Sequence, residues 1–378
     1  MKTRETRDVV IVGGGLVGMA LAYGIAQTGA AVTVLDEGDD AFRASRGNFG
    51  LVWVQGKGYG LPEYARWSMG SARLWPQFAA ALLNATGVDV QLKQPGGFHF
   101  LHSEEELEDR STQFGALRDA LGGEYPFEIL DHATLKTWLP AIGPQVLGAS
   151  YTPMDGHTNP LKLLRALYDA SLKLGVECVR NQQVQRIVTN QAGFEIQGLG
   201  QSWQSAKVVL AAGLGNATLA PQLGLHAPVR PNRGQVLIGD RAAPFLPYPT
   251  TYVRQTDEGT IQLGDSMEDV GYDDTTSTSV LGSIARRAVR SFPVLAGLKL
   301  VRAWSALRVM SPDGFPIYQE SPTSPGAFVV TCHSGVTLAA AHALRIAPWI
   351  AGAPAPDQIN VFAGERFLDP QRTLHHDH

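Results

Sequence analysis

The sequence predicts an α/β fold in which a domain built on a parallel sheet is interleaved with an α+β domain built on a mixed sheet. Three observations predict it. The chain opens on a strand, a glycine-rich turn, a helix and a second strand. Apolar strands that end in glycine return twice, and the stretch between these returns has short alternating runs broken by prolines. At 378 residues, 44% of them hydrophobic, the chain can bury a core for both domains.

The opening unit, residues 9–36, carries a glycine motif in a strand-turn-helix-strand context. A β-branched run at 9–12 leads into Gly13, Gly15 and Gly18, spaced as Gly-x-Gly-x-x-Gly. These glycines allow a tight turn, close approach of a pyrophosphate, and close packing of helix on strand, as in Rossmann-like domains. Asp36 ends the second strand and is placed to accept hydrogen bonds from a ribose. The unit therefore predicts a bound dinucleotide.

The same N-terminal run admits a second interpretation, because an uncharged stretch at 9–26 follows Lys2, Arg4 and Arg7. Such a stretch is compatible with a signal peptide or a membrane span. Three consecutive glycines would each cost about 1 kcal/mol in a helix relative to alanine, so the turn is favoured. We therefore expect no transmembrane segment.

Charge and cysteine content restrict the possible partners. The formal net charge of -4 calls for neither nucleic acid nor an acidic membrane surface. The two cysteines, Cys178 and Cys332, cannot supply the four ligands of an iron–sulfur cluster or of a structural zinc site. We expect no metal site and a reducing, cytoplasmic setting. The C-terminal residues 371–378 are expected to be a polar tail with solvent-exposed histidines.

The loop that follows Asp36 is predicted to contact the nucleotide cofactor. It is rich in small and polar residues, and in a nucleotide-binding sheet such a loop lies over the carboxyl ends of the strands. A solvated loop is the alternative interpretation. The residues that we expect to contact the cofactor here are Glu37, Ser45, Arg46, Gly47, Asn48 and Leu51.

Several later segments carry helix signals. Residues 62–83 place aromatic side chains at spacings near three and four, which is typical of a helix that packs them in a core. Ser103 before three glutamates predicts an N-cap, and Asn159 followed by Pro160 predicts another. His157, just before the second cap, is expected to be structural. The helix after this cap is expected to span 161–174.

Strand signals complete both domains. We expect strands within 88–101 around a Pro-Gly-Gly turn, then at 176–179, 184–188 and 206–213, and short antiparallel strands between 214 and 300. The last apolar strand begins at residue 327 and leads through a glycine turn to a helix from about Val336. Further cofactor contacts are expected from Val184, Gly213, Ser334, Gly335, Val336 and Thr337.

These patterns predict a domain organisation in which each domain is assembled from separate segments. The cofactor domain is expected from 1–88, 145–222 and 300–370. The substrate domain is expected from 89–144 and 223–299, and the tail from 371–378.

The N-terminal fingerprint, the Val184 and 211–213 elements, the 308–314 segment and the closing glycine turn together resemble the D-amino-acid oxidase superfamily of FAD enzymes, which includes glycine and sarcosine oxidases. In glycine oxidase a tyrosine of a Tyr-x-x-Pro-Arg strand and an arginine of a Leu-Arg-Pro segment hold the substrate carboxylate. Tyr252 and Arg308 occupy the similar positions here. Gln255 replaces the strand proline and Val309 the proline after the arginine, so the motifs match in part.

Two stretches, residues 44–58 and 332–339, are more similar to flavoprotein subunits of dye-linked dehydrogenases. These are the β subunit of D-hydroxyproline dehydrogenase, the B subunit of opine oxidases and the C subunit of hydrogen cyanide synthase. The resemblance implies partner subunits: a smaller iron–sulfur protein and a second, flavoprotein-like chain. The scarcity of cysteine here is consistent with cluster ligands on another chain, and equally with a simple oxidase.

The resemblance implies bound FAD and oxidation of a C–N bond in a small α-amino or α-imino acid by hydride transfer from Cα to the flavin. Arg308 would clamp the substrate carboxylate, with Tyr252 beside it, and His333 would lie near the flavin ring as a candidate base. Hydride transfer from a neutral amine requires no strong base. Three functions remain open: a dehydrogenase subunit acting on a D-hydroxyproline-like or opine substrate, a free-standing amine oxidase that uses oxygen, and a flavin-bearing scaffold or electron relay.

Overall fold

The computed structural model describes residues 7–38 and 43–369, so the predicted tail lies outside the described residues. Its largest sheet has eight strands, in the order β16-β17-β11-β1-β2-β8 with a β9-β10 hairpin attached to β11. Strand β1 is parallel to β2 and β11, β2 to β8, and β11 to β17. The strands of this sheet are β1 (Arg7–Val12), β2 (Val32–Leu35), β8 (Glu177–Val179), β9 (Arg186–Asn190), β10 (Gly193–Gln197), β11 (Ser202–Leu210), β16 (Ile317–Glu320) and β17 (Ala327–Thr331).

Both faces of this sheet are covered, as the near-continuous apolar run of β1 requires. Val9 and Ile11 face a core shared with the long helices, whereas Val10 and Val12 face a second core that includes Leu219. The helices on the first face are α1 (Leu16–Ala26), α2 (Pro62–Thr86), α5 (Pro160–Lys173), α8 (Ala339–Ala341), the π-helical η4 (His342–Ile346) and α9 (Ala347–Ala351). The second face carries η1 (Gly213–Gly215), α6 (Asn216–Leu219) and η2 (Ala220–Leu223).

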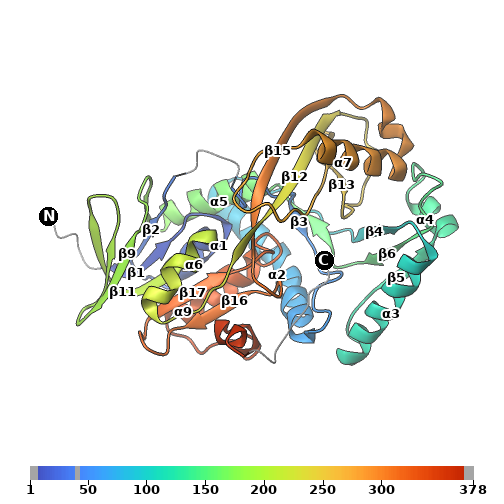
Figure 1. Ribbon diagram of the computed structural model, residues 1–378. Coiled ribbons are helices and arrows are strands. Elements are labelled where there is room, and N and C mark those ends of the chain that lie inside the picture. Colours follow the sequence, from blue (N-terminus) through green and yellow to red (C-terminus); the bar gives the residue numbers. More distant parts are fainter. Residues whose placement is uncertain (1–6, 39–42, 370–378) are drawn as a thin grey trace.

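A second body lies at the other end of the molecule, with the long strands β12 and β15 running up into it (Figure 1). It holds an antiparallel sheet in the order β13-β14-β12-β15 and another in the order β4-β6-β5, which share one apolar core. Its elements are β4 (Gly97–Leu101), α3 (Glu104–Ala120), β5 (Glu128–Asp131), α4 (His132–Trp138), β6 (Gly148–Thr152), β12 (Arg230–Arg241), β13 (Val253–Gln255), β14 (Thr260–Leu263), α7 (Thr278–Ser291), η3 (Pro293–Gly297) and β15 (Leu300–Met310).

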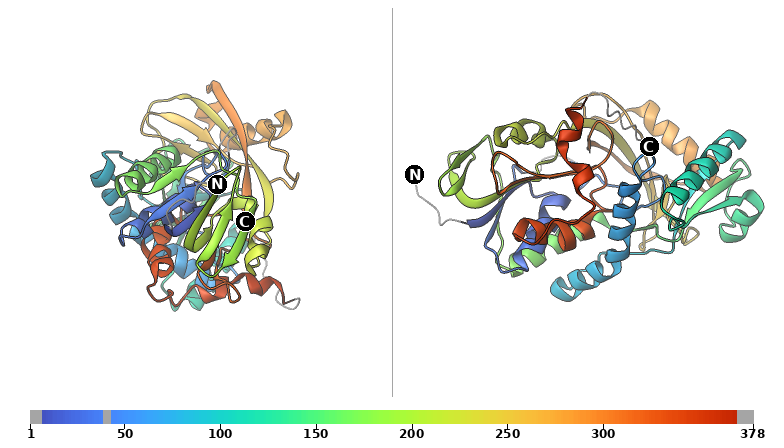
Figure 2. Two further views of the ribbon diagram at one scale, coloured as in Figure 1. Left: turned by 90° about the vertical axis from the view of Figure 1, so that its left-hand side faces the viewer. Right: turned by 90° about the horizontal axis from the view of Figure 1, so that it is seen from below.

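A two-stranded sheet of β3 (Leu51–Val52) and β7 (Gly156–His157) lies between the two bodies, and η5 (Asn360–Phe362) and η6 (Gly364–Phe367) finish the described chain. The view from below shows the large parallel sheet at one end of the molecule and the second body at the other (Figure 2). The predicted fold class is therefore confirmed.

Most predicted helix starts are confirmed. The Oγ of Ser103 accepts a hydrogen bond from the amide of Glu106, and Oδ1 of Asn159 accepts from the amides at the start of α5. Helix α2 runs from Pro62 to Thr86, with Pro76 inside it. No helix among residues 7–38 and 43–369 has the length and apolar character needed to cross a bilayer.

Three predictions are wrong. The segment 214–300 holds the 14-residue helix α7 as well as short strands, because no proline lies between residues 250 and 292 to interrupt it. Residues 88–94 form no strand, because Gln91 has a φ of 57° that ends the extended run, and only Lys93 makes a single bridge with His157. The C-terminal helix begins at Ala339 rather than near Val336, since Thr337 is held in a turn by hydrogen bonds to Trp53.

The domain boundaries stay a prediction, but the strand pairing bears on two of them. Strand β6 begins at Gly148 and pairs with β4 and β5, and β15 begins at Leu300 and pairs with β12 along its length. Both strands thus share a sheet with the predicted substrate segments rather than with the parallel sheet. This pairing favours moving residues 145–152 and 300–310 into the substrate domain.

Candidate cofactor and substrate site

The glycine motif lies where the parallel strands end. The amide of Gly13 donates to the carbonyl of Leu35 at 2.8 Å, and the amide of Ala211 donates to the carbonyl of Val12 at 2.9 Å. Gly13 has a φ of 107°, and a Cβ there would lie 2.3 Å from the Ala211 oxygen. The turn therefore requires glycine, and it brings the ends of three strands to one edge of the sheet, where ligands bind in this class of fold.

Asp36 and Ser45 sit at this edge and already accept hydrogen bonds from the glycine-rich turn. Oδ2 of Asp36 accepts from the amide of Gly14 at 2.7 Å, and Oδ1 accepts from the amide of Gly38 at 3.0 Å. Each carboxylate oxygen retains acceptor capacity for a ribose hydroxyl. The Oγ of Ser45 accepts from the amide of Leu16, at the N-terminus of α1, at 2.9 Å. The structure therefore places Asp36 and Ser45 beside the glycine-rich turn, and their contact with a cofactor stays a prediction.

The other predicted residues of the loop differ in their surroundings. Glu37 forms an ion pair with Arg43 near the surface, and Arg46 is exposed. Asn48 closes a tight turn, because its Oδ1 accepts from the amide of Gly50 at 2.7 Å. The carbonyl of Gly47 accepts from Nε1 of Trp304, on β15, at 3.1 Å. This bond ties the loop to the second body.

The closing turn lies against the same loop. The Oγ1 of Thr337 accepts from the amide of Trp53 at 3.1 Å and donates to the carbonyl of Leu51 at 3.4 Å. A Cβ on Gly335 would have only Val17, at 3.8 Å, within 4 Å. The turn therefore lies beside the start of α1, within van der Waals distance of Val17 for an added Cβ. We call the region bordered by this turn, the Gly13 turn and the loop at 45–53 the cradle.

Four further predicted residues differ in their surroundings. Val184 is buried in the core beneath β1 and β2. Gly213 starts η1 with a φ of 57°, and a Cβ there would meet only Val309, at 3.4 Å. Val336 is buried, and His333 is partly buried between β17 and Ser334.

Sequence reasoning assigned no role to Lys57, which the structure places at the closing turn. Its Nζ donates to Oγ of Ser334 at 2.5 Å, and the hydroxyl of Tyr64 donates to the same oxygen at 3.0 Å. Burial lowers the pKa of Lys57 to about 8. An amine with this pKa changes charge near neutral pH, which is a property of groups at functional sites. The signal that could have pointed to Lys57 is its position between Gly56 and Gly58, in the loop that is predicted to hold the cofactor.

A buried polar network stiffens the loop beside Lys57. Oδ1 of Asp155 accepts from the amide of Val54 at 2.5 Å, and Oδ2 accepts from Nε2 of Gln55 at 2.7 Å. Burial raises the pKa of Asp155 to about 7, against the opposing effect of these hydrogen bonds. The hydroxyl of Ser150, on β6, donates to Oε1 of Gln55 at 2.8 Å. The network therefore couples the loop to the second body.

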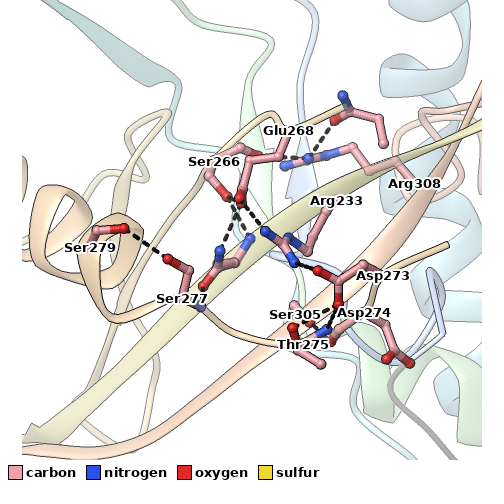
Figure 3. Close-up of polar contacts among 12 residues, drawn as sticks. Arg233, Ser266, Glu268, Asp273, Asp274, Thr275, Ser277, Ser279, Ser305 and Arg308 are labelled. Carbon is pink, nitrogen blue, oxygen red and sulfur yellow. Dashed lines mark hydrogen bonds and ion pairs between the residues drawn. The ribbon is translucent and has the colours of Figure 1, made fainter. Parts of the chain in front are cut away.

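Arg308 lies on β15 and is held from three sides. Its Nη1 donates to Oδ1 of Asn232 at 3.2 Å and to the carbonyl of Ser266 at 2.7 Å; Figure 3 shows Arg308 beside Ser266. Its Nη2 pairs with the carboxylate of Asp265. Because side chains alternate along a strand, Arg308 shares a face of β15 with Trp304, which contacts the cofactor loop. The guanidinium therefore faces the side of the sheet on which the cradle lies.

The loop that carries Asp265 is anchored by the buried Arg233 (Figure 3). Nη2 of Arg233 bonds Oε2 of Glu268 at 2.6 Å, and Nη1 bonds Oδ2 of Asp273 at 2.6 Å. These two ion pairs hold residues 264–277 against β12, which fixes Asp265 beside Arg308.

The structure does not bring Tyr252 into contact with Arg308. The guanidinium of Arg287, on α7, lies 3.7 Å from the centre of the Tyr252 ring. Arg287 in turn donates to the carbonyls of Gly264 and Asp265, each at 2.6 Å. The two predicted substrate residues are thus linked through Arg287 and the segment at 264–265.

Comparison with known proteins shows the family. The model of the family DAO, described as "FAD dependent oxidoreductase", matches residues 8–349. The chain belongs to this family. It is 45% identical to the B subunit of opine oxidase from Agrobacterium tumefaciens (strain Ach5) and 44% identical to that from Rhizobium meliloti, in each case over 95% of this chain and 97% of the relative. The crystal structure of glycine oxidase from Geobacillus kaustophilus superposes with a TM-score of 0.87, at 23% identity, over 95% of this chain and 98% of that one.

The cofactor is therefore FAD, and the chain is an FAD-dependent oxidoreductase of the amino-acid-oxidising type. When bound, FAD supplies the electron-accepting chemistry. The donors at the cradle fit it: glycine amides at a helix N-terminus suit the pyrophosphate, and the spare acceptor capacity of Asp36 suits a ribose. Burial raises the pKa of the Cys332 thiol to about 12, so this cysteine is a neutral thiol beside the closing turn.

Proposed function

We propose that this chain is the flavoprotein subunit that oxidises the Cα–N bond of a small imino or amino acid, such as D-hydroxyproline or an opine, within a dye-linked dehydrogenase complex. The observation that carries the proposal is the position of Arg308. Arg308 and Trp304 lie on the same face of β15, and Trp304 contacts the loop at 43–51 that is predicted to hold the cofactor. The identity of 44% and 45% to the B subunits of two opine oxidases, over nearly the whole chain, supports the assignment.

The proposal gives the cradle residues distinct roles toward FAD. The amides near Gly13, Gly15 and Gly18 would bind the pyrophosphate, and Asp36 a ribose. The loop residues Glu37, Ser45, Arg46, Gly47, Asn48 and Leu51, together with Val184, Gly213, Ser334, Gly335, Val336 and Thr337, would surround the rest of the cofactor. Ser45 supports the first role, because its hydroxyl already lies at the N-terminus of α1.

Arg308 would fix the substrate through its carboxylate, so that one Cα–H bond is presented to the flavin. A planar guanidinium binds a carboxylate through two parallel hydrogen bonds, which sets orientation as well as affinity. Tyr252 would act on a more distant part of the substrate, since it does not reach Arg308. His333 would lie beside the ring, and a neutral substrate amine needs no strong base from it.

Partner subunits are part of the proposal. The two cysteines, Cys178 and Cys332, are both free, and iron–sulfur ligands would have to come from another chain. We expect an iron–sulfur protein and a second flavoprotein-like subunit to receive the electrons, in the cytoplasm. Co-expression with such partners should raise dye reduction without changing the rate of flavin reduction by substrate.

The test is anaerobic mixing of the FAD-loaded protein with cis-4-hydroxy-D-proline, other D-amino acids, sarcosine and an opine. Loss of the visible flavin absorption with any of them supports the proposal. If none reduces the flavin while a reduced partner does, the chain is an electron relay and the proposal is wrong.

A free-standing amine oxidase is a second candidate, favoured by the superposition with glycine oxidase at a TM-score of 0.87. Oxygen consumption separates the two functions. Rapid hydrogen peroxide formation in air, without dye or partner, would identify the oxidase.

A further inference from the structure

Lys57 meets the closing turn, residues 334–337, and has no role in the function proposed above. Its Nζ donates to Oγ of Ser334 at 2.5 Å and lies 5.6 Å from the centre of the Tyr64 ring. The hydroxyl of Tyr64 donates to the same Oγ at 3.0 Å. Both contacts bring a donor to this oxygen, so neither of them uses the hydroxyl hydrogen of Ser334.

The backbone around Lys57 is fixed by helix α2. The amide of Lys57 donates to the carbonyl of Val54 at 3.1 Å, which closes a turn. Gly58 has a φ of 87°, and a Cβ there would lie 2.4 Å from the amide nitrogen of Ala65, on α2. The loop therefore packs directly on the helix.

Helix α2 holds the closing turn as well. The carbonyl of Thr337 accepts from Oγ of Ser71 at 2.7 Å and from Nε1 of Trp75 at 3.1 Å. The loop that carries Lys57 and the turn that carries Ser334 are thus fixed against the same helix. A charge held in this way is in place before any reaction begins.

The ammonium of Lys57 has no carboxylate as an ion-pair partner among residues 7–38 and 43–369. The titratable groups that face it are Asp155, Cys332 and Tyr64. Burial raises the pKa of Cys332 to about 12 and raises that of Tyr64 as well, so both are neutral. Asp155, with a pKa raised to about 7, is already bonded to the amide of Val54. The lysine therefore keeps most of its positive charge at neutral pH.

The reaction creates a charge of the opposite sign. Hydride transfer brings two electrons and one proton to FAD, so the ring system gains one negative charge. In a site shielded from water, a fixed cation stabilises such a charge and needs no rearrangement during the reaction. The proposed function places the closing turn beside the cofactor, and Ser334 belongs to this turn.

We infer that Lys57 is a positioning residue that raises the reduction potential of the bound flavin, acting through the hydroxyl of Ser334 on the negative charge of the reduced ring. The ammonium polarises this hydroxyl, and its unused hydrogen donates to the cofactor. The inference rests on the contact between the closing turn and FAD in the proposed function.

A proton should accompany the electrons in alkaline solution. Burial lowers the pKa of Lys57 to about 8 in the protein without the added charge, and negative charge on the reduced ring raises it. Between these two values Lys57 is neutral before reduction and an ammonium after it. Reduction then takes up one proton from solvent at Nζ, in addition to the one that arrives with the hydride.

The test is the midpoint potential of the full-length, FAD-loaded protein, measured against a dye of known potential with a chemical reductant and without substrate. FAD content is measured for each protein. Lys57→Met removes the charge, Lys57→Arg keeps it, and Ser334→Ala removes the hydroxyl. Lys136→Met, at an exposed position on α4, is the matched control.

At pH 7 we expect Lys57→Met to lower the ratio of reduced to oxidised flavin at a given potential about tenfold or more, which is about 30 mV. Ser334→Ala should lower it about threefold or more, whereas Lys57→Arg and the control should stay within about twofold of the wild type. An unchanged potential in Lys57→Met or Ser334→Ala would overturn the inference. A loss in Lys57→Arg as large as in Lys57→Met would assign the effect to shape rather than charge and would overturn it too.

The pH dependence of the potential is the second measurement. One proton for two electrons gives a slope of about 30 mV per pH unit, and two protons give about 59 mV. The wild-type slope should steepen above about pH 8, and those of Lys57→Met and Lys57→Arg should not. Asp155 titrates in all three proteins, so its contribution cancels. A wild-type slope that stays constant above pH 8 contradicts the inference even if Lys57→Met does not retain FAD.

The two proposals can fail separately, because the potential is measured without substrate. If no amine reduces the flavin and the potentials change as expected, the proposed function is wrong and the role of Lys57 stands. If an amine reduces the flavin and Lys57→Met keeps the wild-type potential, the role of Lys57 is wrong and the proposed function stands.

Discussion

Arg308 on β15 and Asp265, which follows β14, form an ion pair across β12, the strand that lies between β14 and β15. The same guanidinium also donates to Asn232 and to the carbonyl of Ser266, so its plane is fixed before any substrate arrives. This arrangement orients Arg308 and also neutralises part of its charge. A substrate carboxylate therefore has to compete with Asp265 for the guanidinium.

Substitution of Arg308 should weaken substrate binding far more than cofactor binding. Arg308→Lys retains the charge but loses the two-pronged geometry, and Arg308→Ala loses both. We expect half-saturating concentrations for flavin reduction to rise about tenfold in the first and about a hundredfold in the second. FAD content should stay unchanged. Arg302→Ala, an exposed site on the same strand, is the control, and unchanged saturation in Arg308→Ala would remove Arg308 from the site.

Substitution of Asp265 should strengthen substrate binding, whereas substitution of Arg308 weakens it. Asp265→Asn keeps the shape of the side chain and removes the negative charge that faces Arg308. We expect the half-saturating concentration of a carboxylate substrate to fall about threefold to tenfold, because one repulsive charge leaves the site. Asp240→Asn, at an exposed position on β12, should have no effect. Weaker binding in Asp265→Asn would mean that the carboxylate serves mainly to orient the guanidinium.

The features that could be predicted from the sequence are those whose geometry is contained in a short stretch of backbone. The cap of Ser103 and the Asn159–Pro160 helix start depend on neighbours within a few residues, and the positive φ of Gly13 is likewise a property of the local turn; all three are confirmed. The start of the C-terminal helix was misplaced because Thr337 bonds to Trp53, a residue of a distant segment. Local propensity contains no information on such a contact.

The unpredicted parts of the site are contacts between distant segments. Lys57 meets Ser334 only because α2 and the cofactor loop pack against the closing turn. The Asp265 carboxylate faces Arg308 because Arg233 anchors the intervening loop. Helix α7 and its arginines were not predicted, because only short antiparallel strands were expected between 214 and 300, and the cavity they line is created by the approach of β4 and α3.

Lys57 should give the reductive reaction a pH dependence. Burial lowers its pKa to about 8, so the ammonium that bonds Ser334 loses its charge as pH rises through this value. We expect the rate of flavin reduction by substrate to change with a midpoint near pH 8 in the wild type. Lys57→Met should lose this transition and hold the high-pH rate throughout. Lys57→Arg, charged at every pH, should hold the low-pH rate, and a transition that persists in both variants would exclude Lys57 as its origin.

Gly335→Ala separates cofactor contact from folding. The φ of Gly335 lies outside the left-handed region, and an added Cβ would touch only Val17, at 3.8 Å. The free energy of unfolding without FAD should therefore change by less than about 0.5 kcal/mol. If the turn borders FAD, the dissociation constant for FAD should rise about tenfold or more. Gly115→Ala in α3, where a Cβ meets nothing within 4 Å, should leave FAD binding unchanged, and tight FAD binding by Gly335→Ala would move the cofactor away from this turn.

His342 should make the protein sensitive to acid. It is fully buried, its Nε2 is hydrogen-bonded to the hydroxyl of Tyr318 at 2.9 Å, and burial lowers its pKa to about 3. The unfolded chain takes up a proton below about pH 6.5 and the native state does not, so stability is complete above that pH and falls as the pH drops toward 3. At about pH 4.5 the loss from this group is about 2 to 3 kcal/mol. His342→Gln retains a hydrogen-bond acceptor for Tyr318. In this variant the free energy of unfolding in urea should fall less between about pH 7 and pH 4.5 than in the wild type, and the difference should equal this amount. His99 and His157 are present in both proteins, so their contributions to the pH dependence cancel. If both proteins lose the same free energy of unfolding, His342 is protonated in the native core as well as in the unfolded chain, and the prediction is wrong.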